Sequence, residues 1–240
     1  MNRFLGVVHW SLIRHKYILP TFTIIQIVLA IAMMFGLALL MDNVDETASI
    51  YLATGTIAVG IIAVGSSLCA QVVSESKHNG IFNYQRSLPI PRSYILIADT
   101  LIWGLAALPG IVVSFIVAVL RFDLSINITF GNMFTILLFL FATISVGFVI
   151  AYFLQPSAVS IVAQLVLITN LLFSPITFPA SRLPEWIVSI YNVLPFVPGT
   201  NVIRALLFNV GNFYVRDLLT VAIWCVICLS LSLFALSRRS

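Results

Sequence analysis

The sequence predicts an all-α integral membrane protein with six transmembrane helices, and two observations support that prediction. First, 61% of the 240 residues are hydrophobic and 8% are charged, whereas soluble domains carry about 25% charged residues. Second, the hydrophobic residues gather in long runs, and a helix of about 20 residues crosses a hydrocarbon core of about 30 Å. The chain is expected to form helices because lipid cannot satisfy an open backbone. The six runs lie at 17–41, 49–73, 94–120, 131–154, 158–178 and 217–236. We expect residues 1–240 to form a single membrane domain.

Residues 1–16 precede the first run and predict an interfacial helix along the membrane surface. Apolar side chains share one helical face, namely Phe4, Leu5, Val8 and Leu12. Basic residues supply charge, namely Arg3, Arg14, His15 and Lys16. A basic anchor that only sets topology stays open as the alternative. The apolar run that follows is about 25 residues long, too long for the core of a signal peptide, so we expect it to be retained.

The distribution of basic residues predicts that both termini face the cytoplasm. With the N-terminus inside, the inner segments hold eight of the 12 Lys and Arg residues. These are Arg3, Arg14, Lys16, Lys77, Arg86, Arg92, Arg238 and Arg239. The outer segments hold the remaining four, Arg121, Arg182, Arg204 and Arg216.

Residues 74–93 form the most polar loop and are placed in the cytoplasm by this topology. Ile81, Tyr84 and Leu88 recur at i, i+3 and i+7, which indicates a surface helix with one apolar stripe. Pro89 and Pro91 end it before the third run. An amphipathic helix in a short loop is suited to lie in a groove of a partner protein. A plain interfacial helix with topogenic charges is the alternative, and the pattern alone leaves both open.

Residues 179–216, between the fifth and sixth runs, are too apolar for a solvated loop and too rich in proline for one helix. The prolines are Pro179, Pro184, Pro195 and Pro198. We expect two short helices that dip into the outer leaflet and return, as broken or re-entrant helices do. We expect Arg204 to face the wet side of this segment or to pair with Glu185 or Asp217. Trp186 is expected in the aromatic belt.

Several kinds of chemistry are missing from the sequence. It has no Gly-x-x-x-x-Gly-Lys-[Ser/Thr] phosphate loop and no metal-ligand spacing of histidine with carboxylate. Cys225 and Cys228 have the spacing of a redox or zinc pair, but apolar neighbours predict a buried, inert pair. Among the ionisable residues, Asp99 stands slightly inside a span, about one turn into the third. We therefore expect no enzyme activity, no catalytic residue, no metal and no cofactor in this chain, and an ion-coupled carrier is disfavoured.

At two places the sequence resembles the type 2 ABC transporter permeases. The first is the loop at 74–93, where the family has a glycine, apolar residues, a Leu-Pro element and a basic residue, as at Gly80, Leu88, Pro89 and Arg92. The second is the outer segment, where the matching elements are Phe178-Pro179, Leu183-Pro184-Glu185-Trp186, Leu194-Pro195 and Arg204. Together with the six expected spans, the resemblance covers essentially the whole chain. Where the family often has a lysine early in the third span, this chain has Asp99.

The resemblance implies the residues that function in each segment. The residues implied in coupling to an ATPase are Glu75, Lys77, Gly80, Ile81, Tyr84, Leu88, Pro89 and Arg92. Those implied in an outer gate or re-entrant segment are Pro179, Pro184, Glu185, Trp186, Pro195 and Arg204.

The resemblance also implies partners and a function. ATP and Mg would bind two copies of a separate ABC ATPase subunit, and a second permease, identical or related, would complete a dimer. No nucleic acid is implied. The implied function is export of a hydrophobic or amphipathic substrate across a bacterial plasma membrane. Such a substrate could be a drug, as in multidrug resistance, a peptide, a lipid or a glycan-lipid. The alternative is a non-transporting sensor, immunity or assembly subunit, and an ion-coupled carrier is less favoured.

Overall fold

The computed structural model describes residues 3–39 and 45–237, and throughout these ranges the regular elements are helices. The first half of the chain holds α1 (Arg3–His15), α2 (Ile18–Leu39), α3 (Glu46–Ile62), η1 (Ala63–Leu68), α4 (Cys69–His78), α5 (Ile81–Ser87) and α6 (Arg92–Phe122). The second half holds α7 (Phe130–Phe153), α8 (Pro156–Leu172), η2 (Ala180–Arg182), α9 (Glu185–Val193), α10 (Phe196–Leu207) and α11 (Val215–Ser237).

The long helices confirm a multi-pass membrane protein. Five helices of the described chain are long and apolar enough to cross a membrane: α2, the continuous helix from Glu46 to His78, α6, α7 and α11. The run expected at 158–178 forms α8, which is apolar but has 17 residues and ends at Leu172. It ends early because Ser174 precedes Pro175, and a proline disfavours the helical conformation of the residue before it.

The second span is the centre of the bundle. Asp45 begins it by accepting a hydrogen bond from the Ala48 backbone N–H at 2.8 Å, as N-cap residues do. In its middle, η1 is a turn of π-helix packed against α7. A Cβ on Gly147 of α7 would overlap the Gly65 carbonyl oxygen of η1. Only glycine allows these two backbones to approach so closely, so this crossing holds α3, η1 and α7 together.

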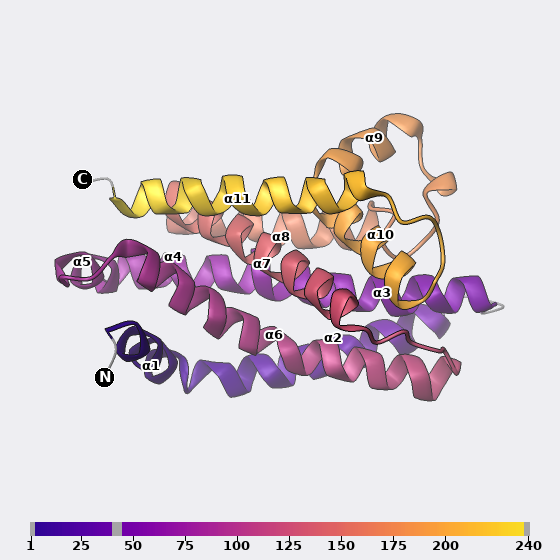
Figure 1. Cartoon of the computed structure of the whole chain (residues 1–240), viewed down its shortest axis with the longest axis horizontal. Coiled ribbons are helices and arrows are strands. Elements are labelled where there is room, and N and C mark those ends of the chain that lie inside the picture. Colours follow the sequence, from indigo (N-terminus) through magenta and orange to yellow (C-terminus); the bar gives the residue numbers. More distant parts are fainter. Residues whose placement is uncertain (1–2, 40–44, 238–240) are drawn as a thin grey trace.

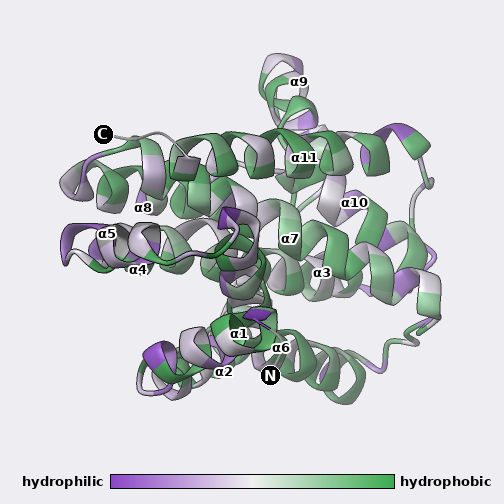
Figure 2. Ribbon diagram, turned by 60° about the vertical axis from the view of Figure 1, so that its left-hand side comes forward, coloured by the Kyte–Doolittle hydropathy of each residue, from purple (hydrophilic) through white to green (hydrophobic). Residues whose placement is uncertain are grey.

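The outer surface of the bundle is apolar along its length. Large hydrophobic side chains of α2, α6 and α11 are exposed, for example Val28, Val112 and Val226. Figure 2 shows hydrophobic residues along the long helices and hydrophilic ones gathered towards their ends. An apolar surface of this extent is expected where helices face lipid.

The bundle has two ends that differ in structure (Figure 1). What we call the α5 end carries α1, the last turns of α4, α5 and the start of α6. What we call the α9 end carries η2, α9, α10 and the loop that joins α6 to α7. All of the predicted functional residues lie at one of these two ends.

Candidate functional site

At the α5 end, the polar loop forms two helices rather than one. Residues 74–78 continue α4, and a turn follows in which Gly80 has a φ of 79°. This left-handed backbone favours glycine and ends α4. The short helix α5 then ends at Ser87, and Leu88 is extended with a ψ of 138°. Ile81 and Tyr84 therefore lie within α5, whereas Leu88 lies just after its end, because Pro89 holds Leu88 outside the helical region.

The other predicted coupling residues have separate environments. Glu75 and Pro89 are exposed. Lys77 donates from Nζ to the Tyr152 backbone carbonyl at 2.8 Å and so binds the last turn of α7. Arg92 donates from Nη1 to the Gln85 carbonyl at 3.0 Å and ties the start of α6 to α5. The loop is thus fastened to α7 on one side and to α6 on the other.

The N-terminal helix α1 lies against both α5 and α6. The ring of Trp10 lies 6.2 Å from the ring of Tyr84, centroid to centroid. Tyr84 is 56% exposed, so one side of its ring contacts α1 while much of it faces outward. Phe4 and Tyr94 make an edge-to-face contact at 5.5 Å. Aromatic pairs of this kind add specific geometry to apolar contact.

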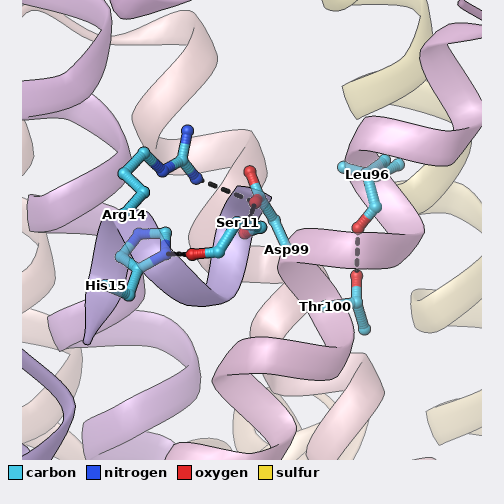
Figure 3. A network of polar contacts seen from close by, with 6 residues as sticks. All are labelled: Ser11, Arg14, His15, Leu96, Asp99 and Thr100. Carbon is cyan, nitrogen blue, oxygen red and sulfur yellow. Dashed lines mark hydrogen bonds and ion pairs between the residues drawn. The ribbon is translucent and has the colours of Figure 1, made fainter. Parts of the chain in front are cut away.

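A buried polar cluster joins α1 to α6 (Figure 3). Asp99 is 4% exposed, and its Oδ1 accepts hydrogen bonds from Ser11 Oγ at 2.6 Å and from Arg14 Nη2 at 2.8 Å. The second bond is also an ion pair. His15 donates from Nδ1 to the Ser11 carbonyl at 2.9 Å and packs edge-on against Trp103 at 5.5 Å. One carboxylate therefore binds two α1 side chains that are a helical turn apart.

The electrostatics of this cluster hold His15 in its neutral form. Burial lowers the pKa of His15 from its ordinary 6.5, and the neighbouring Arg14 guanidinium lowers it further. The Asp99 carboxylate and the bond to the Ser11 carbonyl oppose this shift. Burial is the largest of these effects and sets the direction.

The sequence pattern singles out Asp99 but not its partners. It placed Arg14 among the charges that face water or lipid headgroups and gave Ser11 no role. The available signal was the spacing of Ser11, Arg14 and His15 at i, i+3 and i+4, which puts three polar groups on one side of α1. The sequence does not show that this side faces the third span.

At the α9 end, the prolines separate short elements as expected. Pro179 precedes η2, Pro184 precedes α9 and Pro195 precedes α10. Helices α9 and α10 are bent by 86° relative to each other. Glu185 and Trp186 begin α9 and are exposed, Trp186 to 67%. The prediction that no single helix crosses this segment is confirmed.

Arg204, on α10, is placed differently from the prediction. It is 5% exposed rather than facing a wet surface. Its guanidinium donates to the Ile176 carbonyl at 2.7 Å, to Thr54 Oγ1 at 3.2 Å and to Asn201 Oδ1 at 3.2 Å. It also lies 3.8 Å from the Tyr51 ring centroid. These four partners are uncharged, so the expected pairing with Glu185 or Asp217 is wrong. The reason is that α10 folds back onto α3, which brings the guanidinium to Tyr51 and Thr54.

An apolar hollow of about 710 Å³ opens beside the same helices. Its lining comes from α7, α8, α9, α10 and α11 and includes Val146, Val166, Ile187, Tyr191 and Trp224. Small-molecule sites are typically hollows of about 300–1,000 Å³ with mainly apolar walls. The hollow has the size and chemistry to hold an apolar molecule.

Metal chemistry has no support in the part of the chain that the structure describes. No group of three or more His, Cys, Asp or Glu side chains lies close enough to hold a metal ion there. Cys225 and Cys228 are buried free cysteines within α11, as expected. The candidate functional site therefore consists of the α5 end and the α9 end, which the membrane spans connect.

Comparison with protein-family models decides between a transporter subunit and other membrane proteins. The model described as "ABC-2 type transporter" matches residues 7–208. The chain belongs to the ABC-2 type transporter family. The ABC-2 membrane domain is the permease component of such a transporter, and the family implies association with an ABC ATPase partner. No curated protein and no solved structure matches the chain significantly.

In this ABC-2 permease, the matched residues include α1 from Val7 onward, both helices of the polar loop and the bent pair α9 and α10. Both ends of the bundle thus fall within the family's common region.

Proposed function

We propose that the chain is the permease subunit of an ATP-driven exporter of hydrophobic or amphipathic molecules, and that α5 is the element on which the ATPase acts. The observation that carries the proposal is the position of α5 at the extreme end of the bundle, between the second and third spans (Figure 1). A short helix in that place can enter a groove of a partner while its neighbours stay in the membrane.

The proposed topology places the α5 end in the cytoplasm. Support comes from the eight Lys and Arg residues that the sequence places in the segments on that side, against four on the other. The α9 end then faces outward, and the bent pair α9 and α10 re-enters the outer leaflet as a gate. The expected setting is a bacterial plasma membrane.

The proposed assembly contains two permeases, identical or related, and two ATPase subunits that bind ATP and Mg. ATP binding closes the ATPase pair and displaces α5. The spans then shift as rigid bodies between inward-facing and outward-facing states. Glu75 and the exposed surface of α5 supply the contacts, while Lys77 and Arg92 hold the loop to α7 and α6.

The proposed cargo is apolar or amphipathic, in the range of drugs, peptides, lipids and glycan-lipids. The apolar hollow at the α9 end supports this class, because its walls are lined mainly by aliphatic and aromatic side chains. The scarcity of ionisable residues in the spans supports it as well.

The test is co-purification of the permease with its cognate ABC ATPase from membranes. Tyr84→Asp places a charge on the exposed side of α5, and we expect it to abolish co-purification while membrane insertion is retained. Ser189→Asp, a change at a position of α9 that is also exposed, is the matched control and is expected to leave the ATPase bound. Retention of the ATPase by Tyr84→Asp would remove α5 from the proposal.

A further inference from the structure

Helix α5 is joined to the spans by two non-helical connections. On one side is the turn at Gly80, whose left-handed φ of 79° ends α4 before α5 begins. On the other side, the chain from Leu88 to Pro91 is non-helical. A displacement of α5 therefore reaches the bundle mainly through side chains that touch it, since neither connection continues a helix.

Among the α5 side chains that the structure describes, Tyr84 contacts Trp10 of α1 ring to ring. The Arg14 guanidinium carbon lies 4.9 Å from the Trp10 ring centroid, which is the distance of a cation–π contact. The same guanidinium is bound to Asp99 of α6 at 2.8 Å. Tyr84, Trp10, Arg14 and Asp99 thus form an unbroken series of contacts from α5 through α1 to the third span.

The contact between Arg14 and Asp99 has the most restrictive geometry of this series. Arg14 and Asp99 are 13% and 5% exposed in their side chains. Charge-assisted hydrogen bonds are shorter and stronger than neutral ones, and separating a buried pair leaves two uncompensated charges. Ser11 adds a second bond to the same carboxylate oxygen at 2.6 Å. Sliding α1 along α6 would break both bonds at once.

We propose that the Ser11–Arg14–Asp99 cluster locks α1 to α6, so that a push on α5 is transmitted through α1 to the third span. This inference rests on the proposed function, because it assumes that an ATPase displaces α5. Arg14 and Asp99 are positioning residues in this view: they touch neither ATP nor cargo. They make α1 and the start of α6 move as one body.

The experiment measures the distance between α1 and α6 by EPR in the permease–ATPase complex, with and without ATP plus vanadate. Spin labels are placed at His9 and Ile97, which are exposed on the two helices. The background replaces the chain's three cysteines with alanine, namely Cys69, Cys225 and Cys228. In the chain that keeps Arg14 and Asp99, we expect a single distance between the two spin labels, and nucleotide should not change it.

The test variant is Asp99→Asn. Its amide oxygen can still accept from Ser11 and Arg14, so we expect the native distance without nucleotide. With ATP and vanadate the distance should lengthen or broaden. The permease-dependent change in ATP hydrolysis should fall by about fivefold or more, the lower end of typical coupling between sites, and Asp99→Glu should restore part of it. The matched control is Thr100→Val, because the Thr100 hydroxyl donates to the Leu96 carbonyl within its own helix (Figure 3).

Three results would overturn the lock. The first is a distance that changes with nucleotide in the native chain, and the second is a distance that nucleotide leaves unchanged in Asp99→Asn. The third is loss of the native distance in Asp99→Asn without nucleotide, which would make the pair a structural contact only. Failure of the native chain to bind the ATPase would overturn the proposed function instead. If the native chain binds the ATPase and the Asp99→Asn variant behaves identically, the lock alone is refuted.

Discussion

Each end of the bundle holds an arginine that is largely removed from solvent, and the two ends compensate for its charge in different ways. At the α5 end, Arg14 binds the Asp99 carboxylate at 2.8 Å. At the α9 end, Arg204 binds one backbone carbonyl, two side-chain oxygens and a tyrosine ring, all uncharged. The first arrangement concentrates the stabilisation in one ion pair, and the second spreads it over four neutral groups.

A cation held away from solvent can thus tie elements together by two routes. An ion pair depends on a single partner, so one substitution should disable it. A guanidinium that donates to several neutral acceptors joins several segments, which here are α3, α10 and the stretch that follows α8. Its binding depends on the shape of the five-donor fork. The following predictions test that difference.

The largest effect is expected from Asp99→Leu. This change leaves the largely buried Arg14 guanidinium without a counter-charge, and we expect a loss of about 3–5 kcal/mol in the free energy of unfolding, measured by SDS titration with circular dichroism. Adding Arg14→Met should bring the stability back to within about 1 kcal/mol of the native value, because a buried pair can be replaced by apolar groups. A double variant as unstable as the single one would show that the charge is not the cause.

A smaller effect is expected from Arg204→Met. The buried Ile176 carbonyl loses its donor, and an unsatisfied buried acceptor costs about 1–3 kcal/mol. Arg204→Lys should recover little, since an ammonium cannot reproduce the fork. The same SDS titration measures both, and full stability in Arg204→Lys would mean that charge rather than geometry matters at this end.

A further effect is expected from pH, at the α5 end alone. Because the pKa of His15 is lowered below 6.5 in the folded protein, the unfolded chain binds more protons below that pH. The stability contributed by neutral His15 is therefore present above pH 6.5 and decreases as the pH falls from there towards the folded pKa. Thermal unfolding at pH 7.5 and pH 5.5 should show a smaller pH dependence in His15→Phe than in the native chain.

The smallest effect is expected from Glu185→Gln. Glu185 is exposed in the first turn of α9, where a carboxylate contributes about 0.3–1 kcal/mol through the helix dipole. Combined with Arg204→Met, its effect should be additive, because the two residues are not partners. A coupling energy above about 0.5 kcal/mol in this double-mutant cycle would restore the ion pair that the sequence had suggested.

Much of the fold could be predicted from the sequence because the membrane imposes long apolar helices on any chain that crosses it. The runs at 17–41 and 217–236, for example, correspond to α2 and α11 with small shifts. The broken segment at 179–216 could be predicted equally well, because proline both interrupts a helix and removes a backbone N–H donor. The conformation of the polar loop was harder to predict, because the effect of Gly80 on helix direction depends on a backbone angle that a sequence does not specify.

Composition and local spacing are thus enough to give the class of protein, the number and positions of the apolar runs and the family resemblance. The tertiary structure alone decided that Asp99 meets Arg14 across 85 positions and that Arg204 meets Thr54 across 150. Such pairings depend on how helices are rotated and stacked about their axes. Packing of the whole bundle sets that rotation, as at the close approach of Gly65 and Gly147, and no local pattern encodes it.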